Sequence, residues 1–270
     1  MRVWMMTDME GVCGVVDHDN WVTPEGRYYD AGKELLTMEV NAAVDGFVEA
    51  GATEVVVVDG HGYGGINPLA LDSRALYCRM YPGRHPFLLD EGFDVAAWIG
   101  QHPKAGTEYA HIAHTGWFDV LDFKINGISV GEFGELAMCA ELLGTQSILC
   151  CGDEAFAREA AALVPGIETV ATKRGLTPGT GDECDTTEYR ARNLSAVHLS
   201  PERAQALIRE GAYNALTRFN SDRSSFGEIN IKPPFEKVVK VRQDGDSPAR
   251  ILRAVGDDLP ALLHIPGDEV

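Results

Sequence analysis

The sequence lacks long apolar runs and is poor in basic residues, and both absences exclude classes of protein. No run approaches the ~18 consecutive apolar residues that a membrane-spanning helix needs, so we expect no membrane partner. Lysine and arginine together number 23 against 41 acidic residues, and the net charge of -18 argues against nucleic acid as a partner. No basic segment and apolar stretch follow Met1, so we also expect no signal peptide.

Paired cysteines and nucleotide-binding loops are missing as well. The six cysteines form no C-x-x-C pair, which predicts reduced thiols in a cytoplasmic protein and no zinc site built on sulfur. The stretch GYGG at 62–65 lacks the G-x-G-x-x-G spacing, and no P-loop is present. Nucleotide binding is therefore disfavoured.

Four short apolar segments, each bounded by polar or glycine residues, indicate strands that are buried on both faces. They are VWMMT at 3–7, EVVVVD at 54–59, VAAWIG at 95–100 and SILCCG at 147–152. Helical spacing of apolar residues appears between or after them, in segments 30–51, 134–144, 153–166 and 200–219. This alternation predicts an α/β fold with a mainly parallel sheet flanked by helices.

Two segments depart from the alternation. FKINGISVGE at 123–132 predicts a hairpin that turns at Asn126 and Gly127. INIKPPFEKVVKV at 229–241 predicts late strands around a pair of prolines. We therefore expect a smaller C-terminal α+β portion beside the main sheet.

The domain organisation is predicted to be simple. Residues 1–242 should form a single α/β domain, within which a C-terminal subdomain could begin near residue 195. Residues 243–270 should form a C-terminal tail. Residues 177–193 are polar and rich in turn formers, so we expect a loop or insertion there, without an assigned role.

Acidic and histidine side chains gather where the predicted strands end. Asp8 and Glu10 follow the first strand, and His61 follows the second. His102 follows the third strand, and Glu132 begins a helix after the hairpin. The carboxyl ends of parallel strands meet at one edge of an open α/β sheet, so we expect these five side chains to converge.

A mixture of imidazole and carboxylate groups without sulfur suits zinc. Each residue alone could be an ordinary loop or capping residue, but their coincidence at separate strand ends favours a metal site. Five candidate ligands exceed the roughly three that one catalytic zinc needs, and they fit two metals about 3.5–4 Å apart, bridged by a carboxylate. Bound cations would also explain why two acids, Asp8 and Glu10, lie so close together in the sequence, because the cations remove their mutual repulsion.

Five motifs in this region resemble those of the DppA-type zinc-dependent D-aminopeptidases, peptidase family M55. They are DMEG at 8–11, DGHG at 59–62, GQHPKAGT at 100–107, AHTG at 113–116 and NGISVGEFG at 126–134. The resemblance covers residues 1 to about 242 and implies a di-zinc exopeptidase that removes N-terminal D-amino acids from short peptides. It also implies a homo-oligomer, a ring-shaped decamer whose central channel leads to enclosed active sites.

The resemblance implies a role for each candidate residue. Asp8 would bridge two Zn²⁺ ions per subunit. Glu10 and His61 would complete one metal site, and His102 and Glu132 would complete the other.

A further histidine is implied to take part in catalysis with a metal-activated water. His114 matches the family's catalytic histidine and could act as nucleophile, proton shuttle or oxyanion stabiliser. Asp59 is expected to orient a ligand such as His61. We expect His111 to be structural.

Two other functions stay open at this point. The same di-metal site could serve an amidohydrolase acting on another small amide, such as a cell-wall fragment. A chain that kept the fold without catalysis could instead bind a metal or small ligand. The second alternative predicts that a ligand or catalytic group is missing, and all six candidate residues are present.

Overall fold

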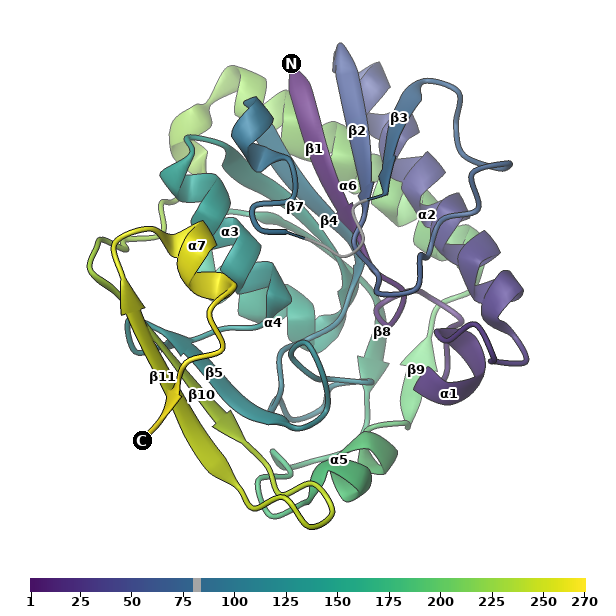
Figure 1. Cartoon of the computed structure of the whole chain (residues 1–270). Coiled ribbons are helices and arrows are strands. Elements are labelled where there is room, and N and C mark those ends of the chain that lie inside the picture. The colour runs from purple at the N-terminus through teal and green to yellow at the C-terminus, as the bar shows by residue number, and fades with distance from the viewer. Residues whose placement is uncertain (80–83) are drawn as a thin grey trace.

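The main sheet has seven strands, and all neighbours in it run parallel except the last pair (Figure 1). The computed structural model describes residues 1–79 and 84–270. In the order of the sheet the strands are β3 (Ala75–Arg79), β2 (Glu54–Asp59), β1 (Arg2–Thr7), β4 (Val95–Gln101), β7 (Gln146–Asp153), β8 (Glu168–Gly175) and β9 (Ala196–His198). The four predicted strands are β1, β2, β4 and β7, so the α/β fold with a mainly parallel sheet is confirmed.

Helices cover both faces of this sheet. The α-helices in the described residues are α1 (His18–Trp21), α2 (Tyr29–Glu49), α3 (Glu132–Leu142), α4 (Glu154–Leu163), α5 (Thr186–Arg192), α6 (Pro201–Ser221) and α7 (Leu259–Leu263). Helices α2 and α6 pack together on one face, α3 and α4 pack on the other, and α7 packs against α3. Successive side chains of a strand point to opposite faces, so Cys150 and Cys151 lie in different hydrophobic cores.

A second, antiparallel sheet lies beside the main one, in the order β12-β11-β10-β5-β6. Its strands are β5 (Val120–Ile125), β6 (Ile128–Ser129), β10 (Phe235–Val241), β11 (Arg250–Gly256) and β12 (Asp268–Glu269). Asn126 and Gly127 connect β5 to β6 with φ values of 50° and 80°. A two-residue hairpin of type I′ requires positive φ at both positions, so the predicted hairpin is confirmed.

Two predictions need correction. Residues 177–193 are not all loop, because α5 begins at Thr186 behind a capping box formed by Asp185 and Glu188. The D-x-x-E spacing that signals such a helix start is present in the sequence, but the turn-forming residues around it favoured the prediction of a loop. Of the late strands expected at 229–241, only β10 forms, and it begins after the two prolines.

The last part of the chain is folded. Residues 243–270 supply β11 and β12 to the second sheet, and α7 buries Leu259 and Leu262 in the core beside α3. The boundary near residue 242 stays a prediction. Within residues 1–79 and 84–270, no helix combines the length and apolarity needed to cross a membrane.

Candidate metal centre

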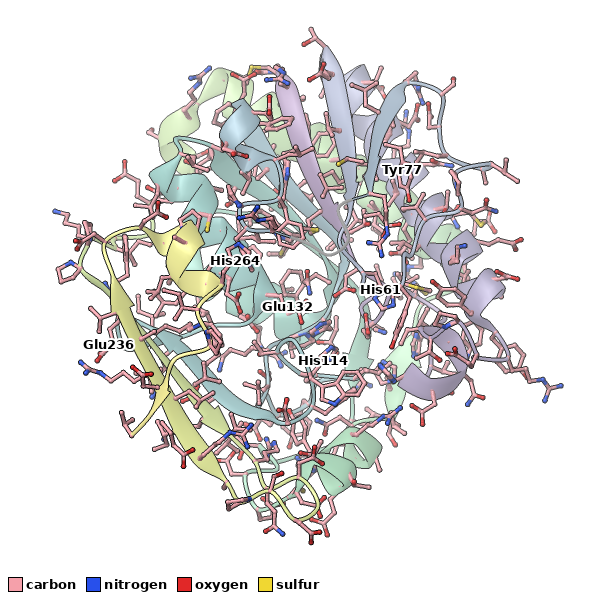
Figure 2. The ribbon with its side chains drawn as sticks, viewed as in Figure 1. His61, Tyr77, His114, Glu132, Glu236 and His264 are labelled. Atoms are coloured by element: carbon pink, nitrogen blue, oxygen red, sulfur yellow. The ribbon has the colours of Figure 1, made fainter. Side chains whose placement is uncertain are left out.

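The candidate ligands meet at the carboxyl ends of three neighbouring strands. Thr7, the last residue of β1, lies beside Asp59 of β2 and Ile99 of β4. The residues that follow these strands are therefore close together. Figure 2 shows His61, His114 and Glu132 near the centre of the molecule, below the ends of the strands.

One group of side chains consists of Asp8, Glu10 and His61, whose ligand atoms all lie within 4.8 Å of one another. His61 Nδ1 is 3.1 Å from Asp8 Oδ1 and 3.4 Å from Glu10 Oε2. All three residues are buried. The structure thus brings together the residues that the sequence predicts for one metal site.

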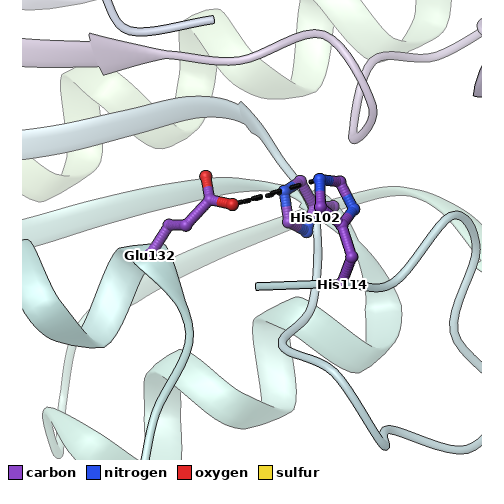
Figure 3. A group of neighbouring side chains, drawn as sticks. All are labelled: His102, His114 and Glu132. Atoms are coloured by element: carbon purple, nitrogen blue, oxygen red, sulfur yellow. Dashed lines mark ion pairs between the residues drawn. The ribbon is translucent and has the colours of Figure 1, made fainter. Parts of the chain in front are cut away.

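A second group consists of His102, His114 and Glu132 (Figure 3). His102 Nε2 lies 3.5 Å from Glu132 Oε1, and the same oxygen lies 4.0 Å from His114 Nε2. The two imidazole rings stack with their centroids 3.9 Å apart. His114 is therefore as close to this group as a ligand would be.

Asp8 connects the two groups. Its Oδ1 faces His61, and its Oδ2 lies 3.3 Å from His102 Nε2. Gln101 Nε2 donates to Oδ2 at 2.9 Å and helps hold the carboxylate in this orientation. A carboxylate with one oxygen toward each group has the arrangement that a bridging ligand needs.

Backbone carbonyl groups determine which ring nitrogen of each histidine faces the carboxylates. His61 Nε2 donates to the Val22 carbonyl at 2.7 Å. His102 Nδ1 donates to Pro103 and His114 Nδ1 to Ile112, both at 2.9 Å. A carbonyl oxygen can only accept a hydrogen bond, so in each neutral ring the other nitrogen presents a lone pair to the acidic groups.

Lone pairs and carboxylate oxygens that face one another repel unless a proton or a metal cation lies between them. Glu10 Oε2 and His102 Nε2 are buried and have no hydrogen-bond partner within the described part of the chain. Metal-binding histidines usually donate their second ring nitrogen to a carbonyl or carboxylate, as all three do here. The donor set and its orientation therefore fit metal ions.

The electrostatics of the centre favour positive charge. Burial acts to lower the pKa of His61 and His102, yet Glu10, Glu132 and the shared Asp8 raise both values well above normal. Burial acts to raise the pKa of Asp8, but its two histidine neighbours hold it well below its usual range. Burial, followed by the nearby His102, lowers the pKa of His114.

Buried polar side chains form hydrogen bonds with the loop that carries Glu10. Lys173 of β8, which is 3% exposed, donates to the carbonyl groups of Glu10 and Val15. Gly11 lies so close to β4 that a Cβ there would be 2.0 Å from the Gln101 carbonyl oxygen. Glu39 of α2 accepts from the Cys13 amide at 2.9 Å. Sequence reasoning missed Lys173 and Glu39, because a charged residue on a partly exposed strand or helix gives no sign that it is buried.

Replacing Glu39 by Gln is expected to remove a pH-dependent cost of folding. Burial raises the pKa of Glu39 to about 8, against the opposing effects of the Cys13 amide and Lys173. The folded chain then keeps a proton on Glu39 that the unfolded chain has released, so the contribution of Glu39 to the free energy of unfolding falls by about 1.4 kcal/mol per pH unit from about pH 4.5 to 8. The advantage of Glu39→Gln should grow over this window in urea unfolding measurements.

The exposed Glu34 on the same helix provides the matched control. Glu34→Gln should stay within about 0.5 kcal/mol of the wild type at every pH, because it removes a solvated charge. Parallel pH profiles of wild type and Glu39→Gln would contradict the prediction.

Two neighbouring residues have structural partners. Asp59 accepts from the amides of Gly65 and Ile66 and from the Tyr77 hydroxyl, so it positions the loop after His61 instead of orienting His61 itself. His111 Nε2 donates to the Val16 carbonyl at 3.1 Å, in agreement with the structural role expected for it.

A cavity of about 340 Å³ opens onto the centre. Besides the acidic and histidine groups, His18, Tyr63 and Trp117 line it. Tyr63 is 58% exposed and Trp117 41% exposed, so the aromatic wall is at the entrance. The arrangement can hold a small molecule with its polar groups against the candidate ligands.

Comparisons with known proteins agree with the geometry. The family model of peptidase family M55, described as D-aminopeptidase, matches residues 1–251. A D-aminopeptidase of Bacillus subtilis (strain 168) is 32% identical over 247 residues, which are 89% of this chain and 81% of that protein. The solved structure of the Zn-dependent D-aminopeptidase DppA from Bacillus subtilis, a self-compartmentalizing protease, superposes with a TM-score of 0.80. That match covers 96% of this chain and 93% of the other at 23% identity, and it shows that the two chains share a fold.

Proposed function

This chain belongs to the D-aminopeptidases of peptidase family M55 and is a metallo-aminopeptidase, and we propose that it is a di-zinc exopeptidase that removes the N-terminal D-amino acid from short peptides. The observation that carries the proposal is the position of Asp8, whose two oxygens face histidines of separate groups. One shared carboxylate between two sets of ligands is what a pair of metal ions requires.

Five side chains would hold the two zinc ions. Asp8 would be shared, Glu10 and His61 would complete one site, and His102 and Glu132 would complete the other. When bound, zinc supplies a Lewis acid that polarises the scissile carbonyl and lowers the pKa of the attacking water. A neutral α-amine of the substrate would be a further nitrogen ligand at this centre, which would account for cleavage at the N-terminus.

His114 is proposed to move the proton. Its Nδ1–H is committed to the Ile112 carbonyl, so the neutral ring has a lone pair on Nε2, 4.0 Å from Glu132. This nitrogen can accept a proton from the attacking water and return it to the leaving amine. An unprotonated Nε2 has no hydrogen to donate, which argues against an initial role as oxyanion stabiliser.

The size of the cavity and the known relative support a restricted substrate range. The cavity of about 340 Å³ suits a short peptide better than a folded chain. The similar Bacillus subtilis enzyme is a self-compartmentalizing protease. We propose that this chain also assembles into a ring, with a decamer as the specific expectation, and works in the cytoplasm with its six thiols reduced.

Paired D- and L-alanyl dipeptides and amides provide the test. Purified protein should cleave only the D substrates, lose that activity on chelation and regain it with zinc. Elemental analysis should find two zinc ions per chain. Cleavage of neither stereoisomer by the zinc-loaded protein would refute the aminopeptidase proposal and direct attention to an amidohydrolase of other small amides.

A further inference from the structure

A second cavity, of about 450 Å³, adjoins the one at the metal centre. It lies between α1 and α5, and His18 lines both cavities. His18 also packs edge-on against Trp117 and Phe118, which follow His114 closely in the chain. The far wall comes from residues 177–193, the segment to which the sequence assigns no role.

Arg190 of α5 is the basic group on the lining of this second cavity. Its Nη2 lies 3.3 Å from His18 Nδ1 and donates to Asp19. Its guanidinium lies 5.5 Å from the centroid of the Trp117 ring, within the range of a cation–π contact. Trp117 also lines the cavity at the metal centre. Its Nε has no hydrogen-bond partner within residues 1–79 and 84–270.

The partner of Arg190 shows what the site can bind. Asp19 places a carboxylate on the guanidinium, yet its side chain is 65% exposed. An exposed ion pair contributes little to stability, so another carboxylate can displace Asp19 at small cost. The planar guanidinium binds carboxylates with directed, charge-assisted hydrogen bonds.

We propose that Arg190 binds the C-terminal carboxylate of a short peptide whose N-terminus lies at the metal centre. This inference rests on the proposed aminopeptidase function and narrows its substrate class to short peptides with a free C-terminus. His18 lines both cavities, so a short extended peptide with its N-terminus at the metal centre would direct its C-terminus toward the guanidinium. The overall charge of -18 would otherwise repel such an acid, and Arg190 offsets that repulsion locally.

Two substrates that differ only at the far end provide the test. D-Alanyl-D-alanine has the free carboxylate, and D-alanyl-D-alaninamide has the same scissile bond without it. The wild type should show a KM at least about tenfold lower for the acid, the usual gain from a charge-assisted hydrogen bond. Arg190→Met should raise the KM of the acid to that of the amide while kcat for both stays unchanged, and Arg190→Lys should restore part of the difference.

Two further variants separate this binding from general effects. Arg192→Met removes the same charge from the same helix, at a side chain that bonds the carbonyl groups of Pro178 and Gly179, and should leave the ratio of the two KM values unchanged. Asp19→Asn removes the competing carboxylate and should lower the KM of the acid alone.

The possible outcomes distinguish a failure of the Arg190 inference from a failure of the proposed aminopeptidase function. If the wild type cleaves both substrates with equal KM, or if folded Arg190→Met affects acid and amide equally, Arg190 does not bind the carboxylate and the aminopeptidase assignment stands. If the zinc-loaded wild type cleaves neither substrate, the proposed function fails and this inference fails with it.

Discussion

Asp8→Asn is expected to lower kcat/KM for a D-alanyl dipeptide by about 1000-fold or more. Asp8 Oδ1 lies 3.1 Å from His61 and Oδ2 lies 3.3 Å from His102, so each oxygen serves a different group of ligands. Asparagine has the same shape but only one such oxygen, and its amide hydrogens would point at a ligand position. Losing one metal removes several kcal/mol of transition-state stabilisation, and each 1.36 kcal/mol is a factor of ten in rate.

Metal content gives the second measurement on this variant. Elemental analysis of Asp8→Asn should find at most one zinc per chain where the wild type holds two. Asp59→Asn is the matched control, because Asp59 is a buried acid at a neighbouring strand end that bonds backbone amides. It should cost some stability and keep both metals. Full activity and two zinc ions in Asp8→Asn would show that Asp8 is not a bridging ligand.

His114→Gln is expected to reduce kcat by about 100- to 10,000-fold, the usual contribution of a general acid–base. Glutamine retains polarity at the position but cannot accept and return a proton near neutral pH. The KM should change little, because the five residues proposed to hold the metal ions remain. Circular dichroism should be unchanged, since the two hydrophobic cores are untouched.

The zinc content of His114→Gln decides between two roles for this histidine. Two zinc ions per chain with reduced kcat would support the proton shuttle. One zinc per chain would instead make His114 a ligand, a role that its place beside His102 and Glu132 also allows. His264→Gln changes an exposed histidine at the end of α7, whose Nε2 lies near the His85 carbonyl and not among the candidate ligands (Figure 2). This variant should match the wild type in both measurements.

Local patterns predicted the elements that build the centre. Continuous apolar runs marked β1, β2, β4 and β7, because strands of a parallel sheet are buried on both faces. Strands β3 and β8 were missed, since partly exposed and polar residues interrupt the apolar run in each. Helix α5 was missed because seven residues give too short a pattern for helical periodicity to appear among turn formers.

The sequence by itself determined that acidic and histidine residues would converge, since parallel strands place their carboxyl ends at one edge of a sheet. It also determined the family, through five motifs in order along the chain. Only the tertiary structure decided which nitrogen of His61 faces the centre, because the Val22 carbonyl that accepts from its other nitrogen is 39 residues away in the chain.

Contacts between segments far apart in the chain could not be predicted from the sequence either. Lys173 supports the Glu10 loop across 163 residues of chain, and Arg190 reaches His18 across 172. No spacing rule relates such residues, because their proximity follows from how β8 and α5 pack against the loops after β1. Local sequence motifs therefore determined which residues form the metal centre. Tertiary packing determined how the loops around it are supported and where the second cavity lies.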